Sequence, residues 1–112
     1  MGLSSDTTGE TQVISVHCDR IDAAMAIQFK EDMRAETQTG AKRIVLDLSS
    51  VEFIDSSGLG AIVASMKQLG DGRRLDLAEP RPIVQKVFRL TRMDTVFRLF
   101  ASLDEAICAE AD

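Results

Sequence analysis

The chain has 112 residues, 45% of them hydrophobic, which suits a single domain with a core of ordinary size. Its net charge of -5, from 18 acidic and 13 basic side chains, argues against nucleic acid as a partner, because nucleic-acid binding normally needs a basic face. No apolar run approaches the ~20 residues that span a bilayer, and the N-terminus has no basic start followed by an apolar stretch, so we expect a cytoplasmic protein without membrane insertion.

The first half of the chain alternates between strand and helix signals. Residues 1–11 are rich in Ser, Thr, Gly and acids, so the sequence leaves open whether a weak edge strand forms there. Residues 12–18 alternate between apolar and polar side chains, which predicts a half-buried strand. Asp22 stands where a helix N-cap is expected, and the helix formers of residues 23–37 predict a helix that Gly40 ends. The face of this helix that we expect to be buried carries Met25, Phe29 and Met33.

The alternation continues in the middle of the chain. Residues 43–48 are nearly all apolar, which predicts a central strand covered on both sides. From Leu59 the apolar residues recur at spacings of three and four, which predicts an amphipathic helix that stops near the glycines at 70 and 72. Residues 74–78 form a predicted short strand, and Pro80 and Pro82 precede a helix that runs through Leu90. The predicted inward face of this helix carries Ile83, Val87 and Leu90.

The end of the chain adds one more strand and helix. Residues 96–100 predict a strand, and Ser102 with Glu105 resembles a capping box that starts a helix through Ala109. The order strand then helix, four times over, predicts an α/β domain whose crossover helices cover a largely parallel sheet. We therefore expect residues 12–112 to form one domain with a mostly parallel or mixed sheet of four to five strands and about four helices.

Polar side chains are concentrated at the junction before the predicted amphipathic helix that includes Leu59. Asp55, Ser56 and Ser57 lie at or beside the helix N-cap, where short polar groups satisfy free backbone N–H groups and the helix dipole favours negative charge. The fold would therefore tolerate a phosphate on a serine here. An unmodified capping serine is the commoner arrangement, and the residues alone leave both readings open. Gly58 either admits a kinase to the neighbouring hydroxyl or allows close packing at a tight loop.

The same junction resembles the STAS domain family, the family of bacterial anti-sigma factor antagonists. The resemblance is carried by Leu46-Asp47-Leu48-Ser49 and, after it, by Asp55-Ser56-Ser57-Gly58-Leu59-Gly60. Arg20-Ile21-Asp22-Ala23 is similar to the family's turn ahead of the first helix, and the stretch from Pro80-Arg81-Pro82 to Val96-Phe97 is similar to its third helix and following strand. Together these stretches cover about residues 12–108. The chain departs from the family pattern at Cys18-Asp19-Arg20 and at Arg92, where glycines are common.

The resemblance implies a protein that acts by binding and is controlled by phosphorylation. By position, the modified serine is Ser57. In the family, the dephosphorylated domain captures an anti-sigma factor that is also a serine kinase and so frees a sigma factor, and a phosphatase restores the captured state. The residues that this resemblance predicts at the partner interface are Asp22, Asp55, Ser56, Gly58 and Leu59. Asp19 and Asp22 would suit a basic partner surface.

Two other classes of function are open to such a domain. Similar domains are attached to anion transporters or belong to lipid-trafficking and stress-signalling scaffold assemblies, where the serine need not be modified. Hydrolysis by Ser57 would need a base, and His17, the only histidine, lies in a predicted strand with no acid to complete a catalytic set. We therefore expect no enzymatic activity. The sequence does not predict whether the chain is a monomer or a dimer.

Cofactor and metal sites are not expected. Gly58-Leu59-Gly60 has neither the dinucleotide-binding nor the Walker spacing. The acids Asp47, Asp55 and Asp94 could converge at one end of the sheet, but acids in loops are usually solvated or capping rather than metal-binding. Cys18 and Cys108 alone make neither a zinc framework nor a disulfide scaffold, so we expect reduced thiols.

Overall fold

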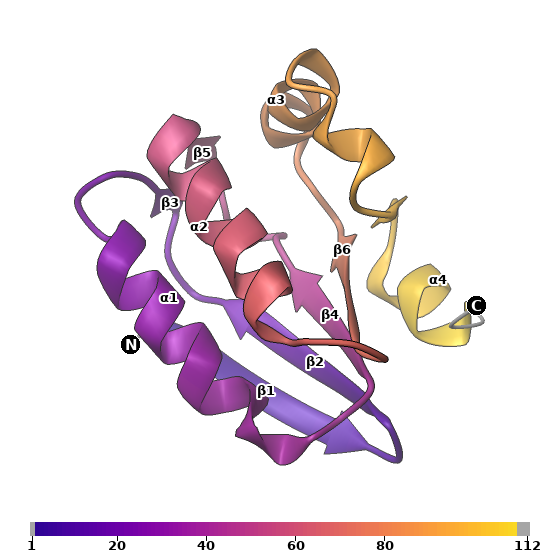
Figure 1. The fold of residues 1–112 in the computed structure, drawn as a ribbon. Helices are drawn as coiled ribbons and strands as arrows, with labels where there is room; N and C mark the ends of the chain where they lie inside the picture. The colour runs from indigo at the N-terminus through magenta and orange to yellow at the C-terminus, as the bar shows by residue number, and fades with distance from the viewer. Residues whose placement is uncertain (1, 110–112) are drawn as a thin grey trace.

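A mixed sheet runs through the computed structural model, which describes residues 2–109. Its strands are, in spatial order, β1 (Leu3–Thr8), β2 (Thr11–Val16), β4 (Arg43–Asp47), β6 (Arg74–Ala78) and β7 (Leu99–Phe100) (Figure 1). β1 is antiparallel to β2, and the other neighbouring pairs are parallel. The predicted α/β class is confirmed, and the polar N-terminal segment does contain an edge strand.

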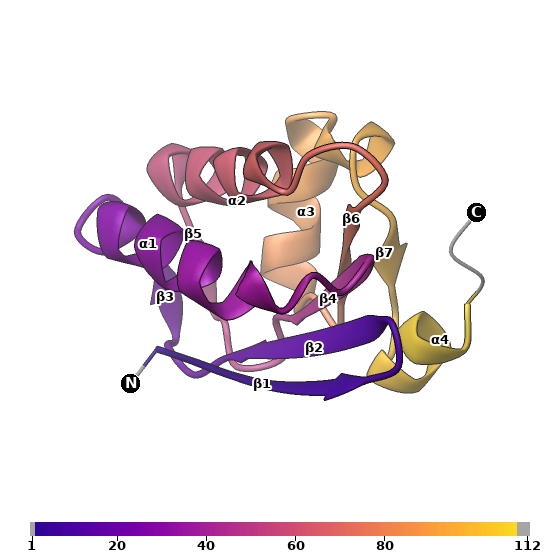
Figure 2. The same cartoon turned by 60° about the horizontal axis from the view of Figure 1, so that its bottom comes forward.

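The helices lie on both faces of this sheet. They are α1 (Ala26–Glu36), α2 (Ser56–Gln68), α3 (Pro82–Leu90) and α4 (Leu103–Cys108), with 3-10 turns η1 (Thr37–Thr39) and η2 (Met93–Thr95). Figure 2 shows α1, α2 and α3 above one face of the sheet, and α4 beside β7 at the other face. The predicted capping residue of α4 is confirmed, because Ser102 Oγ accepts a hydrogen bond from the Glu105 N–H at 3.1 Å.

The central strand β4 has apolar side chains on both sides because both of its faces are covered. Ile44 and Leu46 are fully buried in the main core beneath the helices. Val45 points the other way and packs in a smaller apolar cluster with Ala78 of β6 and Ala106 of α4. Since burial of apolar surface is the main favourable term in folding, this two-sided burial makes β4 the centre of the fold. The nearly continuous apolar run predicted this position.

The start of α1 differs from the sequence-based prediction. Residues 20–21 form a short strand, β3 (Arg20–Ile21), which pairs in parallel with β5 (Phe53–Ile54) as a separate two-stranded sheet. A turn follows β3, so α1 begins at Ala26 with Met25 in the N-cap position. Asp22 is therefore not the N-cap of α1, and instead accepts hydrogen bonds from the Ala24 N–H and the Arg20 side chain.

The predicted inward face of α3 is wrong at Ile83 and Leu90, although Val87 does pack against the main core. Ile83 and Leu90 are 58% and 74% exposed, and Val87 is half-buried, whereas Val84 and Phe88 are fully buried. The ring of Phe88 meets that of Phe97 edge-on with centroids 6.1 Å apart, an arrangement that aromatic pairs prefer. This contact selects the neighbouring apolar stripe of the helix. The last strand is also shorter than predicted, because residues 93–95 form η2 and pairing begins only at Leu99.

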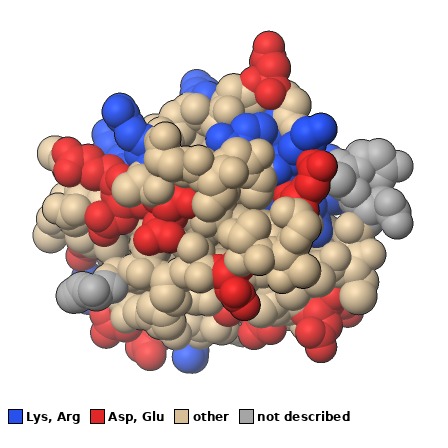
Figure 3. Space-filling view, turned by 90° about the horizontal axis from the view of Figure 1, so that it is seen from below, with Lys and Arg blue, Asp and Glu red and all other residues tan. Residues whose placement is uncertain are grey.

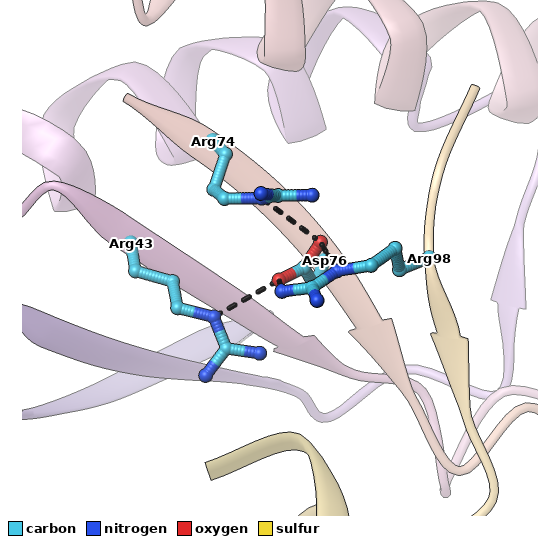
Figure 4. A network of polar contacts seen from close by, with 4 residues as sticks. All are labelled: Arg43, Arg74, Asp76 and Arg98. Atoms are coloured by element: carbon cyan, nitrogen blue, oxygen red, sulfur yellow. Dashed lines mark hydrogen bonds and ion pairs between the residues drawn. The ribbon is translucent and has the colours of Figure 1, made fainter. Parts of the chain in front are cut away.

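A charged cluster with a buried carboxylate at its centre lies on the α4 side of the sheet. Figure 4 shows three arginines gathered around Asp76, whose side chain is 1% exposed. The Asp76 carboxylate accepts hydrogen bonds from Arg43 Nε at 2.9 Å and from Arg98 Nη2 at 3.0 Å, and Arg74 Nε lies 3.5 Å from it. Arg43 comes from β4, Asp76 and Arg74 from β6, and Arg98 from the residue before β7. The cluster therefore ties the three strands together through one carboxylate.

Removal of this carboxylate should destabilise the fold strongly. In Asp76→Ala, Arg43, whose side chain is only 4% exposed, loses its anionic partner while it stays buried. A buried ion pair broken on one side costs about 3–5 kcal/mol. Urea denaturation should show that loss, whereas Asp6→Ala on the exposed strand β1 should change the unfolding free energy by less than about 0.5 kcal/mol. Equal stability of the two variants would show that the cluster does not support the sheet.

Candidate functional site

Asp55 caps α2 and ties it to the segment before α1. Its backbone is extended (φ -111°, ψ -176°), and its Oδ1 accepts a hydrogen bond from the Gly58 N–H at 2.8 Å. Its Oδ2 accepts a second hydrogen bond from the Ala23 N–H at 3.2 Å. The Gly58 N–H, and after it the Ala23 N–H, lower the pKa of Asp55 from its ordinary value of 3.8, although burial opposes the shift. The carboxylate is therefore ionised at neutral pH.

Ser56 and Ser57 are the first residues of α2, and both are exposed. Within residues 2–109, no side chain or backbone group bonds to either hydroxyl, because Asp55 already caps the helix. The sequence left open whether a serine or Asp55 does the capping, and the structure assigns it to Asp55. The Ser57 hydroxyl is thus accessible at the end of a helix whose dipole favours negative charge.

Gly58 is buried against the backbone of β3. A Cβ on Gly58 would lie 1.9 Å from the carbonyl oxygen of Ile21 and 2.6 Å from its carbonyl carbon, distances that no side chain can adopt. Close packing, one of the two sequence-based readings of Gly58, therefore explains this glycine. The same contact lets the first turn of α2 pack directly against strand β3.

An aromatic side chain and a cation lie beside this junction. Phe53 of β5 is 40% exposed, and the guanidinium of Arg20 lies over its ring with Cζ 4.7 Å from the centroid. Arg20 also forms an ion pair with Asp22 at 2.9 Å. Neither residue belongs to the site that the sequence predicted. The apolar pair Phe53-Ile54 before Asp55 was the available signal, but two-residue strands have no periodicity that reveals which way a side chain points.

The structure brings most of the predicted site residues together and buries two of them. Asp55 bonds the N–H of Ala23, directly after Asp22, so these two acids lie close to the start of α2. Asp22 and Asp55 are half-buried, and Ser56 and Ser57 are exposed. Gly58 and Leu59 are buried, so they can shape the surface but offer it little area. The partner-binding role of the set stays a prediction.

The other candidate residues lie elsewhere. His17 Nε2 is 2.6 Å from Ser4 Oγ of β1, so this histidine belongs to the β1–β2 pair rather than to α2. Asp47 accepts a hydrogen bond from the Ser49 N–H. Across residues 2–109 we find no group of three His, Cys, Asp or Glu side chains that could hold a metal ion, and both cysteines are free thiols. In the same part of the chain, no helix has the length and apolar content to cross a membrane.

Comparison with known proteins decides the family. Residues 5–106 match the model of the STAS domain. The chain belongs to the STAS domain family. It is 31% identical over 90 residues to BtrV of Bordetella bronchiseptica, named as a candidate anti-sigma factor antagonist, and the match covers 80% of this chain and 78% of BtrV.

Two solved structures extend the comparison to the whole STAS domain. The first is an anti-sigma factor antagonist from Mycobacterium paratuberculosis, with 28% identity, a TM-score of 0.86, and coverage of 98% of this chain and 93% of that one. The second is the unphosphorylated form of the anti-sigma factor antagonist SpoIIAA, with 28% identity, a TM-score of 0.74, and coverage of 95% and 93%. SpoIIAA of Bacillus has also been solved in a phosphorylated form.

The Gly58 contact can be tested against a glycine in the same helix. Gly58→Ala should cost ~3 kcal/mol of unfolding free energy, because the new methyl group must displace the Ile21 backbone. Gly60→Ala, which meets no atom within 4 Å, should instead stabilise the protein by about 0.5–1 kcal/mol through higher helix propensity. Thermal or urea unfolding of the two variants checks this, and a neutral Gly58→Ala would contradict the packing.

The Asp55 cap should make stability depend on pH. Because the folded state lowers the pKa of Asp55, its carboxylate stabilises the protein at pH above 3.8, and this contribution is lost as the pH falls through the lower folded pKa. Asn also caps helices, so Asp55→Asn removes mainly the charge. Urea denaturation should show wild type ahead of Asp55→Asn at neutral pH, with the gap closing below pH 3.8.

A surface control separates the cap from the loss of net charge. Asp71→Asn changes the charge by the same amount at an exposed turn. Subtraction of its effect should leave the gap between wild type and Asp55→Asn intact at neutral pH. A gap that widens on acidification would rule out the ionised cap.

Proposed function

We propose that this protein is an anti-sigma factor antagonist and that phosphorylation of Ser57 controls its binding. The observation that carries the proposal is the accessible, unbonded Ser57 hydroxyl at the N-terminus of α2, in a STAS domain similar to named anti-sigma factor antagonists. In its dephosphorylated state the domain captures an anti-sigma factor that is also a serine kinase, and so frees a sigma factor. A phosphatase resets the domain. The protein acts by binding rather than by catalysis.

The geometry supports modification without damage to the fold. The Ser57 hydroxyl has no bond to lose within residues 2–109, and the helix N-terminus interacts favourably with added negative charge. Asp55 keeps its own hydrogen bonds to Gly58 and Ala23 when Ser57 changes. A phosphate adds about -1.5 to -2 charges at pH 7. Its effect therefore falls on whatever binds the surface around Ser57.

The surroundings of Ser57 indicate how a partner would sense that charge. Asp22 and Asp55 already make this surface acidic, so a partner that docks here would present basic groups. Arg20 is the neighbouring cation, and it is held by Asp22 and by the Phe53 ring. A phosphate is much larger than the hydroxyl that it replaces, and a partner surface that closes directly over a neutral hydroxyl has no room for it. Loss of complementarity, rather than refolding, is the proposed switch.

Two variants of Ser57 test the switch. Each is purified, and its binding to the anti-sigma factor kinase of the host is measured. We expect Ser57→Ala to bind the kinase as the wild type does, and Ser57→Asp to bind at least about tenfold more weakly by calorimetry. Ser56→Asp, at the exposed neighbouring serine, adds the same charge and is the matched control. It should weaken binding less than Ser57→Asp does.

Mass spectrometry gives a second readout of the same proposal. Incubation with the kinase and ATP should add the mass of one phosphate to the wild type and none to Ser57→Ala. If wild type stays unmodified and both Ser57 variants bind as the wild type does, the alternative holds. The chain would then be an unmodified STAS subunit of a transport, lipid-trafficking or scaffold assembly.

A further inference from the structure

The outward side of α3 exposes a line of aliphatic side chains. Ile83 and Leu90 are 58% and 74% exposed, and Val87, between them in the helix, is half-buried. Positions 83, 87 and 90 are spaced by four and three residues, so the three side chains form one stripe along the helix. Single exposed aliphatic residues are ordinary on protein surfaces. Val87 packs against the edge of the main core beside the fully buried Val84 and Phe88, whereas the exposure of Ile83 and Leu90 on either side of it is not explained by the packing of α3 on the sheet.

Basic side chains border this stripe, although the protein as a whole is acidic. Residues 80–93 contain Arg81, Lys86, Arg89 and Arg92 and no acidic residue, against 18 acids and 13 bases in the full chain. All four basic residues are exposed. Figure 3 shows the opposite side of the molecule from α3, where Asp and Glu are spread over the whole face and Lys and Arg gather mainly in its upper part. The α3 surface thus differs in sign from the acidic surroundings of Ser57.

We propose that this α3 surface, formed by Ile83, Val87 and Leu90 with Lys86 and Arg89 beside them, docks an acidic amphipathic segment of a protein partner. Aliphatic anchors rimmed by cations match a segment whose apolar residues are flanked by Asp or Glu. This partner is distinct from the one at Ser57, because that acidic surface calls for a basic partner. The domain would hold two proteins through surfaces of opposite charge.

Two other occupants fit the surface less well. An anionic membrane would attract the four cations, but the net charge of -5 opposes adsorption, and the nine-residue helix offers no exposed aromatic side chain to the interface. A second copy that docked α3 against α3 would bring two basic rims together, which is unfavourable. Charge complementarity therefore favours an acidic protein segment.

Photocrosslinking in the native host tests the surface with the full chain. A benzoylphenylalanine placed at Leu90 should crosslink to a protein whose mapped peptide alternates apolar and acidic residues, whereas the same group at exposed Gln38 should not. The double variant Lys86→Glu with Arg89→Glu should lower the crosslinked yield about tenfold, since each rim charge would then repel the acidic segment. Lys30→Glu with Arg34→Glu, on the exposed side of α1, is the matched control and should leave the yield unchanged.

The outcomes separate this proposal from the function proposed above. Ser57→Asp should leave the Leu90 crosslink unchanged, and its loss in that variant would show that α3 serves the Ser57 partner. Crosslinks to lipid, to a second copy of this chain or to a basic segment would each overturn the proposal, as would a yield at Leu90 no higher than at Gln38. Thermal unfolding should be unchanged in all charge variants, because every altered side chain is exposed.

Discussion

The absence of a side chain at Gly58 allows the first turn of α2 to lie directly on the Ile21 carbonyl, and the position of Ser57 depends on this contact. Asp55 holds the same turn through the Gly58 N–H and reaches the Ala23 N–H with its second oxygen. Strand β3, the turn before α1 and the start of α2 therefore meet at one point. Because Asp55 and Gly58 supply the cap and the packing, Ser57 has neither task and stays exposed between them.

The surface of this small domain has regions of opposite charge. The start of α2 lies among carboxylates, whereas residues 80–93 on and around α3 carry only basic charge. A net charge of -5 is therefore a poor guide to any single surface of this protein.

The features that could be predicted from the sequence are local ones. The order of strands and helices follows from periodicity, and a cap among Asp55, Ser56 and Ser57 follows from short polar side chains before an amphipathic run, although only the structure shows that Asp55 is the cap. The two-residue strands β3 and β5 have no period, and Arg20 pairs with Phe53 from a distant part of the chain. The sequence allowed two explanations for Gly58, access for a kinase or close packing, and only the contact with the Ile21 carbonyl shows the close packing.

The buried face of α3 also could not be predicted from the sequence of the helix alone. The pairs Ile83-Val84 and Val87-Phe88 give the helix two adjacent apolar stripes, and its own spacing cannot rank them. The choice is made by Phe97, which comes after the helix and packs edge-on against Phe88. A pattern that is ambiguous in one element is thus resolved only by contact with another, and Ile83 and Leu90 are left on the surface.

The charged cluster around Asp76 and the Ser57 hydroxyl lie on opposite sides of the sheet. Asp76 and its arginines tie β4, β6 and the start of β7 on the α4 side, whereas α2 and Ser57 lie on the other face (Figure 2). A negative charge added at this exposed helix end disturbs neither the buried ion pairs nor the Asp55 cap, and the helix dipole favours it, so the fold stays intact. Any affinity that it removes must then come from the partner contact itself. A modification of that kind is fully reversed when the phosphate is removed, because the domain has not rearranged.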